Sequence, residues 1–527
     1  MAPIRVAHCL RKFGNESSQN YRWLQSIISI NVWFSIVKDR PKDYIKKTVH
    51  SFSVLNTLAI SLLKMSNSKG GRNQFLAAIT CNLISFSYGI ATAWSGPNYV
   101  LLMSDNTPLR AGPLTQSEAS MVVSILSIGG MIGTLIYGYL INFYERRMLL
   151  VSIAVSQIIS FALLYFATDV YYLYAARLIT GICGGACFIV IPIYVSEIAD
   201  DVLRGMLGSM IVLIINFGIL ILYVIDNLAS YHNQIIILVL VPILFLALIK
   251  FFPETPEFLQ KEGHILLAQK SRDFYSGAPS PVEMKDMSKS KAEKSPIEEK
   301  TYDKMESDSL TFGDFCTKAA IKSTIITMFL AVLGPFCGVF VMINYSNKIF
   351  KDAGSSLSPS TSSIIVAVVQ IVANLLTTIL ADRAGRKLLL SLSSAGAAFS
   401  LMSMGLHDQF KNEILEFSPT LHSIMPIVSF SMIILSGSIG ILPLTAVIFM
   451  EILPTKIKRM TSMLAFLLNW LVSFINVQIF PSMIEWIGMS GCMFALAMFC
   501  LFGLFFTILI IPETKGKSHD EIMKSLE

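Results

Sequence analysis

The sequence predicts an all-α membrane protein whose chain crosses the bilayer twelve times, in two halves of six helices. An apolar composition, twelve hydrophobic runs and a repeat of charged motifs support this prediction. Hydrophobic residues make up 54% of the 527 residues and Asp, Glu, Lys and Arg only 14%, whereas soluble domains carry about 25% charged residues. This balance excludes an ordinary soluble enzyme, a disordered chain and a collagen-like chain. The formal net charge of +6 does not indicate a nucleic-acid partner.

Twelve runs have the length and apolarity to cross the hydrocarbon core, which takes about 20 residues of helix. The first six are residues 74–97, 119–141, 148–168, 171–195, 206–226 and 233–252. The second six are residues 320–343, 360–381, 388–406, 424–450, 461–483 and 490–511. The predicted halves are therefore 73–252 and 319–511. Between them, residues 253–318 alternate in charge and contain few aromatic residues, which predicts a solvated linker.

Basic residues of the short loops are distributed unequally between the two sides of the predicted membrane. The linker side carries Arg146, Arg147, Arg204, Arg383, Arg386, Lys387, Lys456, Lys458 and Arg459. The other side carries Arg110, Lys348, Lys351 and Lys411. Because Lys and Arg are enriched in cytoplasmic loops, we expect the linker side to face the cytoplasm. We also expect a multi-pass protein of the plasma membrane. Its linker, both chain ends and the 512–527 tail would be cytoplasmic.

Residues 1–72 form a basic N-terminal extension, with twelve Lys or Arg residues and three acids. Their apolar runs, 23–37 and 51–63, are too short to span a bilayer, and no small-residue cleavage site indicates a signal peptide. One hypothesis is a basic arm on the anionic inner leaflet. The other, which we favour, is an isoform-specific or gene-model extension, because Met65 begins a natural short lead into the first span.

Charged motifs recur at matching places in the two halves, 240 to 259 residues apart. The matching pairs are 142–147 with 382–387, Glu197 with Glu451, and Pro253-Glu254-Thr255 with Pro512-Glu513-Thr514. Such a parallel duplication, with a solute site near the midplane between the halves, is a transporter plan.

These residues resemble the signature motifs of a known family. The segments IPIYVSEIADDVLRGMLGS, PETPEFL, DRAGRK, EILPTKIKR and IPETKGKS are similar to those of sugar porters in the major facilitator superfamily. The resemblance runs from about Gln74 to the C-terminus. FSYGIATAWSGP, PLTQSEAS and YSNKIFKDAGSSLSPSTSSIIV most resemble insect facilitated trehalose transporters. The resemblance implies a twelve-helix major facilitator fold with two halves in parallel pseudo-symmetry. It also implies alternating access and a sugar as small-molecule partner. We expect a monomer in the lipid bilayer, without cofactor, metal or nucleic acid.

The resemblance also implies a charged latch at the cytoplasmic face, which stabilises the outward-facing state in the family. When these roles are carried over, Glu197 and Arg204 would meet Arg146 in the first half. In the second half, Glu451 and Arg459 would pair with Arg383, Arg386 and Asp382. Asn142, Phe143 and Glu145 depart from the family pattern, so we expect a weakened or rewired latch in the first half. The alternative is ordinary surface charge that follows the positive-inside rule.

Two features bear on the driving force and the solute. Gly89 replaces the aspartate of the family's proton symporters, no acid lies at the centre of a span, and no P-loop pattern is present, so we expect an uncoupled facilitator. Arg177 is expected to be structural, at the interface or at a helix C-terminus.

The family's sugar-binding amides and tryptophan are replaced by Gly334, Pro335, Phe340, Val212 and Ala446. Gln370, Asn469, Trp470 and Asn344 remain as candidate solute ligands, and the alternative for each is helix packing or an interhelical hydrogen bond. The leading hypothesis is facilitative transport of a sugar such as trehalose or a hexose. A carrier of a less polar solute and a non-transporting sensor or receptor are the alternatives, and an enzyme is not expected.

Overall fold

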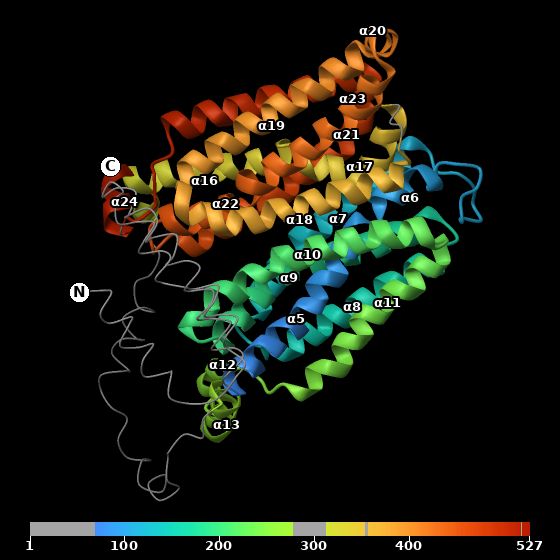
Figure 1. Cartoon of the computed structure of the whole chain (residues 1–527). Helices are drawn as coiled ribbons and strands as arrows, with labels where there is room; N and C mark the ends of the chain where they lie inside the picture. Colours follow the sequence, from blue (N-terminus) through green and yellow to red (C-terminus); the bar gives the residue numbers. More distant parts are fainter. Residues whose placement is uncertain (1–68, 278–311, 354–356, 518, 527) are drawn as a thin grey trace, which may run out of the picture. The chain divides into compact units, whose positions relative to one another are not determined.

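The computed structural model describes residues 69–277, 312–353, 357–517 and 519–526, which all belong to one compact unit. Regular structure in these ranges is helical throughout (Figure 1). The expected extension at 1–72 lies outside the described residues except for its last four positions. Of the 253–318 linker, the structure describes the two ends, residues 253–277 and 312–318. The boundaries predicted for the extension and the linker therefore stay predictions.

Membrane-length helices follow the order that the hydrophobic runs predict. The first half contains α5 (Lys69–Ala93), α6 (Ser95–Leu102), α7 (Gln116–Leu140), α8 (Arg146–Tyr165), α9 (Val170–Ile198), α10 (Asp201–Leu228) and α11 (Tyr231–Leu248). The second half contains α16 (Lys318–Phe336), α17 (Val339–Asp352), α18 (Pro359–Ala384), α19 (Arg386–Gln409), α21 (Pro419–Ser436), α22 (Leu442–Ile452) and α23 (Lys458–Leu509). The described chain offers 11 candidate membrane spans. The last, 52 residues long, contains two predicted spans, because Gly488 at φ 74° interrupts its helical backbone.

Three predicted spans have an irregular turn within their length, although each remains one candidate membrane span. The first span divides at Trp94 into α5 and α6. The seventh divides between α16 and α17, where Gly338 adopts φ 88°, a conformation that favours glycine. The tenth contains a π-turn at Gly437–Ile441 between α21 and α22. Hydropathy does not reveal such breaks, because the residues on either side remain apolar.

Short helices mark the two ends of the bundle. At one end lie α12 (Pro256–Lys261), α13 (Ile265–Ser276) and α24 (His519–Leu526) (Figure 1). Glu197 accepts from Thr255 next to α12, and Glu451 lines a recess with His519 of α24, so both glutamates lie at this end. We call this the cluster end. At the other, the far end, lie α6 and α20 (Lys411–Phe417).

Glycines allow close packing of α7 against α9. A Cβ added to Gly129 would lie 2.1 Å from the Leu178 carbonyl oxygen, and one added to Gly133 would lie 2.2 Å from that of Ile182. Both distances are too short for any side chain. The GxxxG spacing of Gly129 and Gly133 therefore allows the two helices to pack closely.

Candidate functional site

The halves meet at the far end through α6 and α17. Ser95 Oγ donates to Asn344 Oδ1 at 2.7 Å, and both residues are buried. The backbones also approach closely, because a Cβ on Gly96 would lie 2.7 Å from the Ile343 carbonyl oxygen. Side chains of any size at Gly96 would separate the two helices. Asn344, a candidate solute ligand, thus has its amide in the contact between the halves, and its Nδ2 donates to the Phe340 carbonyl at 2.8 Å.

A second far-end contact joins α10 to the second half. Ser360 Oγ of α18 donates to Asp226 Oδ2 at 3.0 Å, and the other oxygen of Asp226 accepts from Gln234 at 3.0 Å. Tyr223 donates its hydroxyl to the Ile343 carbonyl of α17 at 3.2 Å. These bonds extend the closed contact across the far end.

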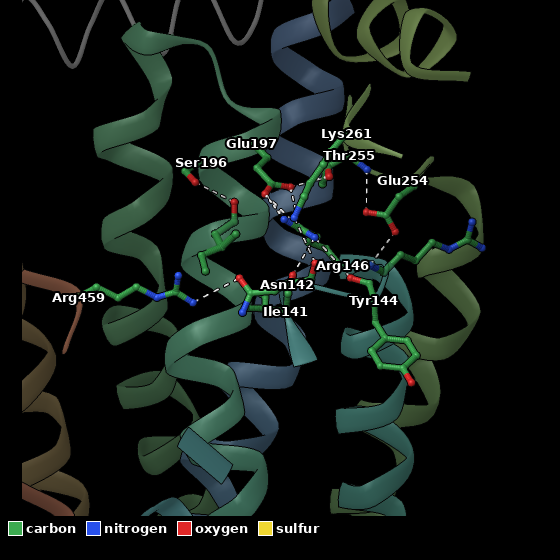
Figure 2. Close-up of polar contacts among 12 residues, drawn as sticks. Ile141, Asn142, Tyr144, Arg146, Ser196, Glu197, Glu254, Thr255, Lys261 and Arg459 are labelled. Carbon is green, nitrogen blue, oxygen red and sulfur yellow. Dashed lines mark hydrogen bonds and ion pairs between the residues drawn. The ribbon is translucent and has the colours of Figure 1, made fainter. Parts of the chain in front are cut away.

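The cluster end of the first half is organised around Arg146, the first residue of α8 (Figure 2). Its Nη2 lies 2.9 Å from Glu197 Oε1, and its Nε lies 3.1 Å from both oxygens of that carboxylate. Nη1 donates to the Ile141 carbonyl at 3.0 Å. Thr255 donates its hydroxyl to Glu197 Oε2 at 2.6 Å, and the Phe258 ring covers the guanidinium at 4.7 Å. Such a multiply bonded, half-buried pair holds α8 to the end of α9.

Glutamates of the two Pro-Glu-Thr motifs cap the third and ninth spans. Glu254 Oε2 accepts from the Arg147 backbone N–H at 2.9 Å, at the start of α8. Glu513 accepts from the backbone N–H groups of Arg386 at 3.0 Å and Lys387 at 3.2 Å, at the start of α19. A carboxylate is stabilising there because the first N–H groups of a helix lack intrahelical acceptors. Burial raises the pKa of Glu254, an effect that the hydrogen bonds from backbone N–H groups oppose.

The second half repeats the pair of an arginine with a glutamate. Arg386, the first residue of α19, places Nη2 3.3 Å from Glu451 Oε1. The pairs expected within each half, Arg146 with Glu197 and Arg386 with Glu451, are therefore brought together. Their role as a latch stays a prediction.

Arg459 is placed differently from the expectation of a partner within its own half. Its Nη2 donates to Asn142 Oδ1 of the first half at 3.4 Å (Figure 2). Arg204 lies close enough to Glu257 of α12 to favour that residue's charged form, although burial raises the pKa of Glu257 overall. The side chains of Asp382 and Arg383 lie outside the described residues. Asn142 is one of the positions that depart from the family pattern, and a rewired latch in the first half stays a prediction.

Two asparagines of α23 replace backbone hydrogen bonds that are missing in the seventh span. Pro335 has no N–H, so the Ala331 carbonyl loses its helical donor, and Asn469 Nδ2 donates to that carbonyl at 3.0 Å. Asn476 Nδ2 donates to the Pro335 carbonyl at 2.9 Å. Asn476 was not among the sequence candidates, although its position two helical turns after Asn469 on the same helix face signals a shared role. The amide of Asn469 thus has a structural partner.

The other candidate ligands are also in packed surroundings. Gln370 is 6% exposed, and its backbone carbonyl accepts from Asn374 Nδ2 at 2.9 Å. Trp470 packs on α7 of the opposite half, because a Cβ on Gly130 would lie 2.7 Å from its indole ring. Solute contact by either side chain stays a prediction.

Arg177 of α9 is buried inside the helix bundle, so its side chain does not extend to the membrane–water interface. It donates to the Ala91 carbonyl near the end of α5, to the Val122 carbonyl at 3.3 Å and to Ser95 Oγ at 3.3 Å. The indole of Trp94 lies 5.7 Å from its guanidinium. This confirms the expectation that Arg177 lies at a helix C-terminus. The negative end of the α5 dipole partly compensates the buried positive charge.

Comparison with known proteins decides the family. The model of the sugar (and other) transporter family matches residues 56–526. The chain belongs to this family. Its match begins earlier in the chain than Gln74, where the recognisable motifs start.

Family members with curated names are similar over most of their length. The facilitated trehalose transporter Tret1 of Polypedilum vanderplanki is 31% identical over 455 residues, which are 86% of this chain and 88% of that protein. Tret1 of Bombyx mori is 28% identical over 458 residues, which are 86% of this chain and 86% of that protein.

Solved structures establish the major facilitator fold. The inward-open xylose transporter XylE from E. coli aligns with a TM-score of 0.69 at 22% identity, over 86% of this chain and all of that one. A D-xylose–proton symporter aligns with a TM-score of 0.64 at 21% identity, over 84% of this chain and 99% of that one. This family member is therefore a multi-pass membrane protein with the predicted fold.

Proposed function

We propose that the protein is a facilitative, uncoupled transporter of a sugar such as trehalose or a hexose, which works by alternating access. We place it in the plasma membrane, with the cluster end and both termini cytoplasmic. The observation that carries the proposal is the distribution of bonds between the halves. At the far end, Ser95, Tyr223 and Ser360 each donate across the interface. At the cluster end, the described bond between the halves, from Arg459 to Asn142, is longer, at 3.4 Å. Such an interface is closed on one side and weakly joined on the other, as a rocking carrier requires.

The placement of the acids supports uncoupled transport. Each acidic residue on a described membrane-spanning helix lies in a first or last turn or next to a break. Glu118, Glu197, Asp201, Asp226, Asp352, Asp382, Asp408 and Glu451 are in end turns, and Glu485 of α23 lies just before the interruption at Gly488. Arg177, the buried charge within the spans that the structure describes, is held by carbonyls and a hydroxyl. A proton-coupled carrier needs a central acid that changes protonation, so the simpler mechanism is movement down a gradient.

The charged residues of the cluster end would control the rocking. In the described state, Arg146 with Glu197 and Arg386 with Glu451 tie helices together within each half. Closure of the cluster end would bring the two clusters together, and Arg459 already reaches across. The full latch that we propose contains Glu197, Arg204, Arg146, Glu451, Arg459, Asp382, Arg383 and Arg386.

The trehalose transporters among the relatives favour a sugar, and Gln370, Asn469, Trp470 and Asn344 remain the proposed ligands. One observation favours a less polar solute as a second candidate. The amides of Asn469 and Asn344 already bond to Ala331 and Ser95, and Phe340 and Ala446 add no polar group. A sugar would have to compete for amides that have partners, at a cost of about 1 kcal/mol for each hydrogen bond exchanged.

Counterflow in proteoliposomes tests both candidates. Vesicles loaded with unlabelled trehalose, glucose or a less hydroxylated solute are diluted into the labelled form, with and without a pH gradient. We expect saturable exchange of a sugar that the pH gradient leaves unchanged. Accumulation driven by the gradient would contradict uncoupled transport. Exchange confined to the less polar solute would replace the sugar, and exchange of none would refute transport.

A further inference from the structure

Both halves carry an arginine–glutamate pair at the cluster end, but an aromatic ring lies over the arginine of the first pair only, among the described residues. In the first half, Phe258 lies over Arg146, and Thr255 completes the bonds of Glu197. In the second half, Thr514 Oγ1 and Glu451 Oε2 are buried and have no hydrogen-bond partner among the described residues. Thr514 itself is 4% exposed. The equivalent hydroxyl and carboxylate oxygens of the first half, those of Thr255 and Glu197, bond to each other.

The register of the repeat explains this difference. When Pro253-Glu254-Thr255 is aligned with Pro512-Glu513-Thr514, Phe258 corresponds to Lys517. An exposed lysine after Gly516, which adopts φ 71°, thus stands where the first half has an aromatic cover. What remains is a recess of about 560 Å³, whose polar lining is Arg386, Glu451, Thr455, Lys458, Thr514, Lys517 and His519. Sites for small molecules have about this volume.

The lining has an excess of positive charge. Arg386, Lys458 and Lys517 are opposed by a single carboxylate, that of Glu451. The side chains of Lys458, Lys517 and His519 form no hydrogen bond or ion pair within the described ranges. Lys458 is also the first residue of α23, so the positive end of that helix dipole adds to the field. Cations around a buried hydroxyl donor are the groups that bind phosphate oxygens in proteins.

We propose that this recess binds a phosphate group through Arg386, Lys458, Lys517 and the hydroxyl of Thr514. The bound anion would compete with Glu451 for Arg386, whose contact with that carboxylate is already longer than the equivalent contact in the first half, at 3.3 Å against 2.9 Å. Free phosphate and a phosphorylated lipid headgroup share this chemistry. Binding is independent of the proposed transport and would be measured without it.

Titration of the purified full-length protein tests the proposal. In an uncharged detergent, inorganic phosphate is titrated while intrinsic fluorescence or heat is recorded. In a second arm, phosphatidylcholine nanodiscs with and without phosphatidylinositol 4-phosphate are compared with the soluble inositol phosphate. Lys517→Phe restores the aromatic cover of the first half, and Thr514→Val removes the buried hydroxyl. Lys250→Ala, an exposed lysine at the same end of the first half, is the control.

We expect saturable binding that Lys517→Phe weakens by at least about tenfold, equivalent to one decade in Kd, and that Lys250→Ala leaves unchanged. Thr514→Val should weaken it in the same direction. Tighter binding in the lipid arm than to the soluble headgroup would identify a lipid as the source, and equal binding would identify free phosphate. The absence of saturable binding in both arms would overturn the proposal. Equal weakening by Lys517→Phe and Lys250→Ala would also overturn it.

Discussion

Replacing Ser95 with alanine tests whether the far-end contact holds the described state. Ser95 Oγ donates to Asn344 Oδ1 at 2.7 Å and accepts from Arg177 Nη2 at 3.3 Å. Asn344 is 2% exposed, so water cannot replace the lost donor without opening the interface. A buried polar atom left without a partner costs about 1–3 kcal/mol. This contact should be absent from a conformation in which the far end is open. The equilibrium between the described state and that far-open state should therefore shift toward the far-open state by about 5- to 150-fold.

Distance measurements between spin labels would detect this shift. Asp105→Cys and Glu413→Cys place labels on exposed far-end positions of the two halves, in a background with Cys9→Ser and Cys316→Ser. We expect Ser95→Ala to increase the population of longer distances by at least about fivefold. Ser400→Ala is the matched control, because Ser400 is also buried but, among the described residues, its hydroxyl bonds to the Gly396 carbonyl of its own helix. Unchanged distances in a folded Ser95→Ala protein, or the same shift in Ser400→Ala, would refute the reasoning.

Two further predictions concern the cluster end. Thr255→Val should lower the free energy of unfolding by about 1.5–3 kcal/mol, because the hydroxyl bonds to a carboxylate. Thr514→Val in phosphate-free buffer should change it by less than about 0.5 kcal/mol; equal losses in denaturant titrations would contradict this. Because folding raises the pKa of Glu254, the folded state binds its proton more tightly. Wild-type stability should therefore fall, relative to Glu254→Gln, as pH rises from the ordinary glutamate pKa through the raised value. Thermal unfolding between pH 4 and 8 checks the sign, and parallel curves for the two proteins would refute it.

The spans and the charged pairs were predictable from the sequence for different reasons. Run length and apolarity determine whether a segment crosses a bilayer, so the order of helices followed directly. The pairing of Arg146 with Glu197 and of Arg386 with Glu451 followed from the resemblance to the sugar porters, whose latch residues match these positions. The helix caps by the Pro-Glu-Thr glutamates were missed, although the motif was recognised as repeated. Their partners are backbone N–H groups, which every residue except proline carries and which no sequence pattern singles out.

The candidate solute ligands were harder to predict, because an amide within a span has the same sequence signal whether it binds solute or backbone. Asn344 illustrates this, since its partner Ser95 lies 249 residues away in the chain. The far-end contact depends on how the halves meet, which no local pattern encodes. Sequence patterns thus identified polar positions within the spans but not their partners.

A double-mutant cycle between Asn469 and Pro335 separates the two roles of Asn469. If this amide replaces the hydrogen bond that Pro335 cannot donate to the Ala331 carbonyl, Asn469→Ala should destabilise the wild type by about 1–3 kcal/mol. In a Pro335→Ala background, the new N–H can reach that carbonyl, so the same change should cost at least about 0.5 kcal/mol less. Thermal unfolding without solute gives the four stabilities, and counterflow gives the four transport rates. A ligand role alone predicts additive stabilities and a loss of exchange that Pro335→Ala does not rescue. Additive stabilities would therefore refute the structural role, and restored exchange in the double variant would refute a direct contact between Asn469 and the solute.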